Sequence, residues 1–402
     1  MSDVGDVLQQ TTHALLQLRS ETASIALADQ LVRRYSALDD DGRTTYFAFL
    51  LEELGADRRA VDDAIDAYRQ HPSEQTLGQL TMTSESRRQP LFRAMNVAPG
   101  GIDVLLDMRA ALLERRSTHP ELAPVEHDLQ HLLRSWFNRG FLELRQLDWS
   151  TPAIVLEKLI EYEAVHEIEG WTDMQRRLAP DRRSFGFFHP ALPNEPVIFV
   201  EVALTTGLAT SVQELLDAPT PDATPAGIDT AIFYSITNCQ EGLHGISFGN
   251  FLIKQVTARL GMELPDLTTF ATLSPVPGFA TWLAEHHPDL DTGDRHALEH
   301  RCAEYLLTER RGRLPADPVA RFHLRNGARV EQINWQGDTS AKGMKESHGL
   351  LVNYLYSGQD PAANHDLLVQ DGIVVASAKV IELAGVSVDA SQVVESPARV
   401  AG

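Results

Sequence analysis

Apolar residues recur at helical spacing through the first third of the chain. The pattern is clearest in LLQLRSETASIALADQLVRRY (15–35), RTTYFAFLLEELGA (43–56) and GGIDVLLDMRAALLERR (100–116). Turn-forming residues separate these runs, and a proline-bounded segment (119–124) precedes one more helix that ends near Trp136. The pattern predicts an all-helical bundle over residues 1–138. This region carries no recognisable chemical motif, so we expect a scaffold or an oligomer interface.

Beyond residue 139 the pattern changes to short apolar runs between helices and loops. VIFVEVAL (197–204), AIFYSI (231–236) and LTTFATL (267–273) are rich in β-branched or aromatic residues and predict strands. SVQELLD (211–217) and NFLIKQVTARL (250–260) predict helices, and the proline-rich stretch 218–227 predicts a loop. The fold class is therefore α+β, with a mixed α/β domain over residues 139–402 after the helical domain.

Composition narrows the class of protein. A chain of 402 residues exceeds the usual size of one hydrophobic core, which agrees with two domains. The formal net charge of −21 argues against a nucleic-acid partner, because phosphates would be repelled. Two cysteines, Cys239 and Cys302, are too few for a disulfide framework or a thiolate metal site. No apolar run approaches the ~20 residues that span a bilayer. Because the N-terminus also lacks a basic leader, we expect a cytoplasmic protein without a membrane partner.

A glycine-bearing turn follows the predicted strand 231–236. The turn contains glycines at 242, 245 and 249, and a helix should begin near Phe248. Backbone N–H groups at a helix N-terminus bind anions, and glycines let a phosphate approach the backbone closely. The turn matches neither a Walker A loop nor a dinucleotide fingerprint. The spacing is thus compatible with a phosphate cradle and equally with a plain strand-to-helix turn.

Ser274 stands where a predicted strand meets a rigid turn. Pro275 and Pro277 fix the backbone on both sides of Val276 and remove two hydrogen-bond donors. The strand should therefore end near Ser274, at the edge where ligand sites of open α/β sheets gather. The serine either holds its hydroxyl in a site or caps the helix that begins near Phe279.

The segment DPVARFHLRNG (317–327) predicts a helix that carries His323. Val319, Phe322 and His323 share one helix face, so the histidine either belongs to the core or acts as a catalyst. Asn326-Gly327 marks the helix C-terminus, whose negative end would favour the imidazolium.

Tyr354 and Tyr356 alternate around Leu355, so in a strand both rings face one side, toward a shared polar site or the core. HEIEGW, at 166–171, and the pair His286-His287 lack the spacing of metal ligands. We therefore expect no metal site.

Taken together, these segments resemble the malonyl-CoA decarboxylase family. HPALPNEPVIFVEVALT, AIFYSI, QEGLHGISFGNFLIKQV, LSPVPGF, DPVARFHLRNGA, INW and GLLVNYLY occur in the family's order and close to its spacing. The resemblance is strong over residues 140–357 and weaker upstream. It implies that the second domain is a catalytic domain of the acetyltransferase (GNAT) type, in which acyl-CoA phosphates sit on a strand-to-helix turn.

The resemblance also assigns roles to individual residues. It implies a catalytic serine at Ser274 and a catalytic histidine at His323, with Ser235 and Tyr356 as further active-site residues. The acyl-CoA loop falls on seven consecutive residues: His244, Gly245, Ile246, Ser247, Phe248, Gly249 and Asn250. Animal members of the family carry a glutamate where this chain has Ser247, which puts in doubt any role for an acid there.

The implied reaction converts malonyl-CoA to acetyl-CoA and carbon dioxide, and its chemistry fits these residue types. Loss of carbon dioxide leaves an enolate, which needs oxyanion stabilisation and then a proton. The CoA thioester is the substrate, and no metal, biotin or nicotinamide is required. A CoA-dependent acyltransferase and a non-catalytic acyl-CoA sensor are the alternatives. Self-association as a homo-oligomer, dimer or tetramer, through the helical domain is a family expectation.

Overall fold

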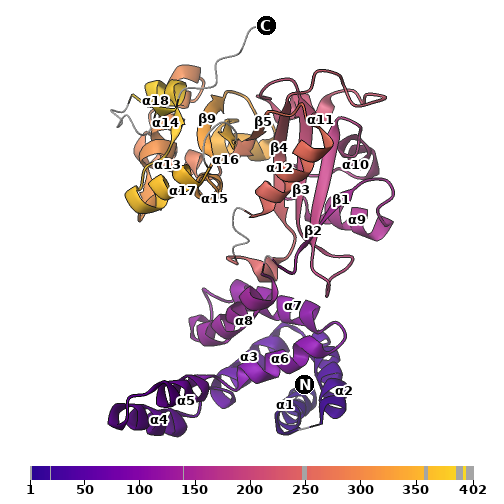
Figure 1. Cartoon of the computed structure of the whole chain (residues 1–402), viewed down its shortest axis with the longest axis vertical. Coiled ribbons are helices and arrows are strands. Elements are labelled where there is room, and N and C mark those ends of the chain that lie inside the picture. Colours follow the sequence, from indigo (N-terminus) through magenta and orange to yellow (C-terminus); the bar gives the residue numbers. More distant parts are fainter. Residues whose placement is uncertain are drawn as a thin grey trace. The chain divides into compact units, whose positions relative to one another are not determined.

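The computed structural model describes residues 2–18, 20–138, 140–246, 251–356, 361–385 and 393–394 (Figure 1). The chain divides into two compact units. The helical unit contains Met1–Glu143, Phe188–Val197 and Asn238–Ser247, and the sheet unit contains Leu144–Phe187, Ile198–Thr237 and Phe248–Gly402. Two short segments from beyond residue 187 thus join the helical unit.

The helical unit confirms the predicted bundle in the first third of the chain. Its helices are α1 (Ser2–Gln17), α2 (Glu21–Ser36), α3 (Asp40–Glu53), α4 (Arg58–Gln70), α5 (Glu74–Ser84), α6 (Arg88–Val97), α7 (Gly101–Glu114), η1 (Pro120–Leu122), α8 (Ala123–Trp136) and η2 (Glu241–Leu243). One difference is that the run 15–35 is not a single helix. The backbone of Ser20 is extended and starts α2, so the periodic pattern bridges a break between two helices.

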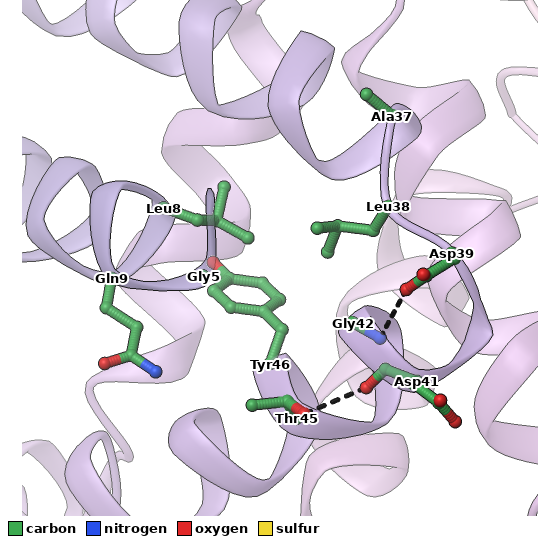
Figure 2. A pocket seen from close by; sticks show the side chains of 10 residues that line it. All are labelled: Gly5, Leu8, Gln9, Ala37, Leu38, Asp39, Asp41, Gly42, Thr45 and Tyr46. Atoms are coloured by element: carbon green, nitrogen blue, oxygen red, sulfur yellow. Dashed lines mark hydrogen bonds between the residues drawn. The ribbon is translucent and has the colours of Figure 1, made fainter. Parts of the chain in front are cut away.

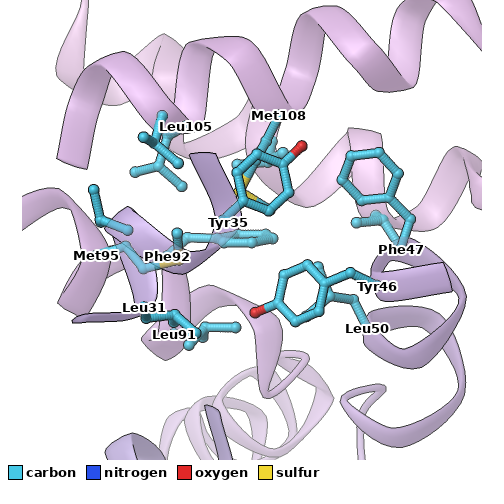
Figure 3. Close-up of a cluster of buried hydrophobic side chains, with 14 of the residues drawn as sticks. Leu31, Tyr35, Tyr46, Phe47, Leu50, Leu91, Phe92, Met95, Leu105 and Met108 are labelled. Atoms are coloured by element: carbon cyan, nitrogen blue, oxygen red, sulfur yellow. The ribbon is translucent and has the colours of Figure 1, made fainter. Parts of the chain in front are cut away.

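Aromatic and aliphatic side chains from several helices form the core of the helical unit (Figure 3). Tyr35, Phe47 and Phe92 are completely buried there. Gly101 shows how closely the helices pack, because a Cβ at this position would lie 1.8 Å from the Met95 carbonyl oxygen. A tight turn at 98–100 thus joins α6 to α7, with Gly100 at a left-handed φ of 68°.

A mixed sheet forms the centre of the sheet unit. Its strand order is β1-β2-β3-β4-β5-β10-β9-β11-β12, with β6 also paired to β10. β4 and β5 are parallel, and β10 runs antiparallel to β5, β6 and β9. The strands are β1 (Glu143–Leu147), β2 (Arg182–Phe188), β3 (Pro196–Thr205), β4 (Thr230–Asn238), β5 (Thr269–Thr272), β6 (Ser274–Pro275), β9 (Arg329–Asn334), β10 (Leu351–Leu355), β11 (Ala376–Ser377) and β12 (Val393–Val394), beside a small hairpin of β7 (Arg310–Arg311) and β8 (Leu314–Pro315).

Helices alternate with these strands, which confirms the predicted α+β class. They are α9 (Ala153–Tyr162), α10 (Trp171–Arg177), α11 (Val212–Asp217), α12 (Phe251–Glu263), α13 (Phe279–His286), α14 (Arg295–Thr308), α15 (Pro318–Arg325), α16 (Ala341–Ser347), α17 (Pro361–Asp366), a π-helical turn (Leu367–Asp371) and α18 (Ala378–Ala384). The strands predicted at 197–204, 231–236 and 267–273 appear as β3, β4 and β5. None of the described helices combines the length and apolar character that a bilayer-spanning segment needs.

Candidate active site

Ser274 and His323 lie side by side in the sheet unit. Ser274 begins β6 and is held opposite Val352 of β10, and His323 projects from α15. The Ser274 Oγ and the His323 Nε2 are 3.0 Å apart. Both residues are buried, with 6% and 4% of their surface exposed. Two residues separated by 49 positions in the sequence thus form one hydrogen-bonded pair.

Two tyrosines from the end of β10 surround the imidazole. The Tyr356 hydroxyl lies 2.8 Å from the His323 Nδ1. The Tyr354 ring stacks on the imidazole, with ring centroids 4.7 Å apart and planes inclined by 24°. Both rings contact the same histidine, which agrees with the prediction that they face one side of the strand. Their chemical roles differ, because the Tyr354 hydroxyl has no hydrogen-bond partner within the described part of the chain.

Thr272 extends this group and was not singled out from the sequence. The Ser274 hydroxyl donates a hydrogen bond of 2.8 Å to the Thr272 Oγ1, which also accepts from the backbone N–H of Tyr354 at 3.3 Å. Thr272 is fully buried. The signal was available, since residues two apart in an extended chain face the same side.

Asp317 links the helix of His323 to the turn after Ser274. Its Oδ1 accepts from the backbone N–H groups of Val319 and Ala320, both at 2.9 Å, and so caps α15. Its Oδ2 accepts from the Gly278 N–H at 3.2 Å. Burial raises the pKa of Asp317 to about 6. Gly278 starts α13 without any side-chain cap, so the alternative that Ser274 caps this helix is wrong.

The structure indicates a neutral His323, whereas its place at the end of a helix predicted an imidazolium. The C-terminal end of a helix should favour the imidazolium, but burial lowers the pKa of His323 to about 3. Loss of hydration outweighs the partial charge of a short helix, because the two ring nitrogens face hydroxyl groups and not carboxylates. His323 is thus a neutral imidazole at neutral pH.

Ser235 belongs to a second hydrogen-bonded group. Its hydroxyl donates to the Glu163 Oε2 at 2.7 Å and lies 3.2 Å from the Thr237 Oγ1. The Glu163 carboxylate also accepts from the backbone N–H groups of Val165 and His166. The parallel pairing of Phe233 with Thr272 directs this end of β4 toward the level of Ser274. Glu163 was not singled out from the sequence, because no local pattern joins it to a serine 72 residues away.

The expected acyl-CoA loop is only partly described. Of its seven residues, Ser247, Phe248, Gly249 and Asn250 lie outside the described part of the chain, while His244, Gly245 and Ile246 belong to the helical unit. Gly245 has a φ of 74°, which favours glycine. The buried Arg109 of α7 donates to the Gly242 carbonyl at 2.6 Å and is paired with Glu126. The start of the loop is thus anchored to the helical unit.

A cavity of about 290 Å³ adjoins this site in the sheet unit. Tyr356 lines it and so connects it to His323, and the other lining residues are Ile253, Lys254, Thr257, Ala258, Phe270, Asn326 and Pro361. A second cavity, of about 340 Å³, lies in the helical unit between α1 and the start of α3 (Figure 2). It contains none of the predicted site residues. Across the described ranges, no three His, Cys, Asp or Glu side chains gather as a metal site.

Comparison with protein families matches both parts of the chain. The model of the malonyl-CoA decarboxylase C-terminal domain matches residues 140–299 and 286–394, and the model of the malonyl-CoA decarboxylase N-terminal domain matches residues 54–137. These matches show that the chain is an enzyme of the carboxy-lyase class. It belongs to the malonyl-CoA decarboxylase family.

Individual relatives are similar over most of their length. The mitochondrial malonyl-CoA decarboxylase of the goose Anser anser anser is 31% identical over 88% of this chain and 82% of its own. The mouse (Mus musculus) enzyme is 34% identical over 74% of this chain and 71% of its own. The crystal structure of the malonyl-CoA decarboxylase from Rhodopseudomonas palustris is 44% identical, covers 94% of this chain and 99% of its own, and superposes with a TM-score of 0.88. The crystal structure of the malonyl-CoA decarboxylase from Agrobacterium vitis is also 44% identical, covers 94% of this chain and 100% of its own, and superposes with a TM-score of 0.89.

Proposed function

We propose that the chain converts malonyl-CoA to acetyl-CoA and carbon dioxide, with Ser274 and His323 as its catalytic pair. The observation that carries this proposal is the 3.0 Å contact between the Ser274 Oγ and the His323 Nε2 in a buried site. We infer the substrate from the relatives, which are malonyl-CoA decarboxylases. The residues supply a chemistry that suits it, because a hydroxyl and a neutral imidazole can hold a carboxylate and move a proton.

The reaction breaks one carbon–carbon bond and uses one proton. The bond between the carboxylate carbon and the methylene carbon breaks, and its electron pair passes into the thioester to form an enolate. Ser274 donates a hydrogen bond to the carboxylate and accepts a hydrogen bond from the Nε2–H group of His323. After carbon dioxide has left, His323 gives this proton to the methylene carbon, which completes acetyl-CoA. As Nε2 gives up its proton, the Tyr356 hydroxyl donates its own proton to Nδ1, so the imidazole stays neutral. A proton from water then enters at Nε2 and the Nδ1 proton returns to Tyr356, which restores the Nε2–H imidazole.

Burial is suited to both steps of this reaction. A malonyl carboxylate in water is stabilised by hydration, and that stabilisation is lost when carbon dioxide forms. A site as enclosed as that of Ser274 and His323 therefore favours the neutral product. The cavity beside Tyr356 is large enough for the acyl end of the thioester and too small for a whole coenzyme. We place the acyl group there, with Ser235 as a further polar contact, and keep the acyl-CoA loop at residues 244–250 as a prediction.

Other expectations from the sequence are part of the same proposal. The reaction as written requires no metal, biotin or nicotinamide, because the thioester itself accepts the electron pair. We also keep the cytoplasmic location and the dimer or tetramer through the helical unit as predictions.

The test is an assay of the purified chain with malonyl-CoA and no acyl acceptor, in which citrate synthase and oxaloacetate detect acetyl-CoA. Steady formation of acetyl-CoA supports the decarboxylase. If malonyl-CoA binds but acetyl-CoA forms only when an amine or thiol acceptor is added, the acyltransferase is correct. Binding without turnover under either condition would identify a sensor.

A further inference from the structure

The directions of the hydrogen bonds around His323 follow from the number of protons available. Ser274 has a single hydroxyl proton, and it is donated to the Thr272 Oγ1 at 2.8 Å. The hydrogen bond of 3.0 Å between Ser274 and His323 must therefore be donated by Nε2–H and accepted by the serine oxygen. A neutral imidazole carries only one N–H, so Nδ1 is unprotonated and accepts from the Tyr356 hydroxyl at 2.8 Å.

A backbone group fixes the far end of this chain of hydrogen bonds. The Tyr354 N–H can only donate, and it points to the Thr272 Oγ1 at 3.3 Å. The Asn353 side chain donates to the Thr272 carbonyl at 2.8 Å and so holds the same residue from its main chain. Thr272 thus presents its oxygen as an acceptor to Ser274 from a fully buried position.

We propose that Thr272 is a positioning residue that keeps His323 in its Nε2–H tautomer by accepting the Ser274 proton. This inference rests on the proposed function, in which that Nε2 proton goes to the enolate carbon. Without an acceptor at position 272, the Ser274 hydroxyl would turn toward Nε2, and the imidazole proton would move to Nδ1. In the substrate-free enzyme, the Nε2 atom that faces Ser274 would then carry no proton.

The same arrangement explains how the site changes when substrate arrives. A carboxylate is a stronger acceptor than a threonine hydroxyl, because a charge-assisted hydrogen bond is roughly twice as strong as a neutral one. The malonyl carboxylate therefore takes the Ser274 proton from Thr272, and the Nε2–H bond to the serine oxygen stays in place. Thr272 thus accepts the Ser274 proton before substrate binds, the carboxylate accepts it afterwards, and the tautomer remains the same through the exchange.

The experiment reads the tautomer directly. The full chain is labelled with ¹⁵N-histidine, and long-range ¹H–¹⁵N correlation spectra at neutral pH distinguish an Nε2–H from an Nδ1–H imidazole. The chain has 15 histidines, so the His323 signals are assigned by their loss in His323→Gln. We expect the Nε2–H pattern in the wild type and in Thr272→Ser, and the Nδ1–H pattern in Thr272→Val. Thr230→Val, a buried threonine on the neighbouring strand β4, is the matched control and should leave the spectrum unchanged.

Kinetics supply the second readout. Thr272→Val should raise KM for malonyl-CoA about tenfold to a hundredfold with kcat within about twofold, because the bound carboxylate must first restore the Nε2–H tautomer, and Thr272→Ser should restore KM. An Nδ1–H imidazole in the wild type, or an Nε2–H imidazole in Thr272→Val, overturns the inference. Thr272→Ala replaces the valine variant if that variant does not fold. Full activity of Ser274→Ala would instead overturn the proposed function, while the tautomer result would still stand.

Discussion

Two of the buried polar networks in the described part of the sheet unit differ in charge. In the first, Arg177 is almost completely buried and donates to Glu201 at 2.7 Å, to Asp173 at 3.2 Å and to the His166 carbonyl at 2.8 Å. In the second, the Ser274–His323 pair and its hydroxyl neighbours are all uncharged at neutral pH. The first network joins α10 to β3, and the second joins β6, α15 and β10.

The difference shows how one fold uses buried polarity in two ways. An ion pair fixed by several donors has one stable arrangement, because moving any proton or side chain leaves an uncompensated charge. A row of hydroxyls and an imidazole has two arrangements of similar energy, since every member can both donate and accept. The neutral network also borders a cavity through Tyr356. Protons can therefore move in the second network, while the first acts as scaffold.

The largest effect should come from breaking the ionic network. Arg177→Met leaves Glu201 buried without its partner and should lower the free energy of unfolding by about 3–5 kcal/mol in urea denaturation. The folded fraction should keep its kcat. Arg33→Met, which removes an exposed ion pair with Asp29, is the control and should change stability little. A large loss of kcat in Arg177→Met at unchanged stability would show that this network takes part in the chemistry.

The next largest effect is a loss of folding stability at low pH that comes from His323 in the uncharged network. The pKa of His323 is about 3 in the folded chain and about 6.5 when unfolded, so the unfolded state binds more protons between these values. Stability is therefore lost as pH falls below about 6.5. Between pH 7 and pH 5 the wild type should lose about 2 kcal/mol more than His323→Gln, by urea denaturation at both pH values. Other titrating groups, such as Asp317, cancel in this difference. Parallel pH profiles of the two proteins would contradict the buried neutral histidine.

The smallest effect distinguishes the two tyrosines that contact the imidazole. Tyr356→Phe removes the hydroxyl on Nδ1 and should lower kcat about tenfold, which is about 1.4 kcal/mol of barrier. Tyr354→Phe keeps the ring that stacks on His323 and removes a hydroxyl with no partner in the described ranges, so kcat should hardly change. The steady-state assay of both variants is the measurement. A larger loss in Tyr354→Phe than in Tyr356→Phe would refute the assigned roles.

Local patterns predicted several of the elements around these networks but not α10, which carries Arg177. The β-branched runs at 197–204 and 231–236 became β3 and β4, and Asp317, Pro318 and Gly327 bound the helix of His323. The break at Ser20 was missed, because two amphipathic helices in sequence share one periodicity.

The pairing within the site could not come from local patterns. Ser274 meets His323 only because β6, β10 and α15 come together from distant parts of the sequence, and the family resemblance supplied that pair. The charge state of His323 was predicted wrongly, since burial is a property of the whole fold and not of its helix. Glu163 and Arg177 were missed for the same reason, because their partners lie far along the chain.

The most direct test of the central claim is to compare Ser274→Ala, His323→Asn and the double variant in the acetyl-CoA assay, with malonyl-CoA binding measured by calorimetry. If the two residues act as one unit, each single variant should lower kcat by about a hundredfold to ten-thousandfold. The double variant should then lose little more than either single one, and all three should still bind substrate. Near-normal turnover in either single variant, or losses that multiply in the double variant, would contradict a shared Ser–His mechanism.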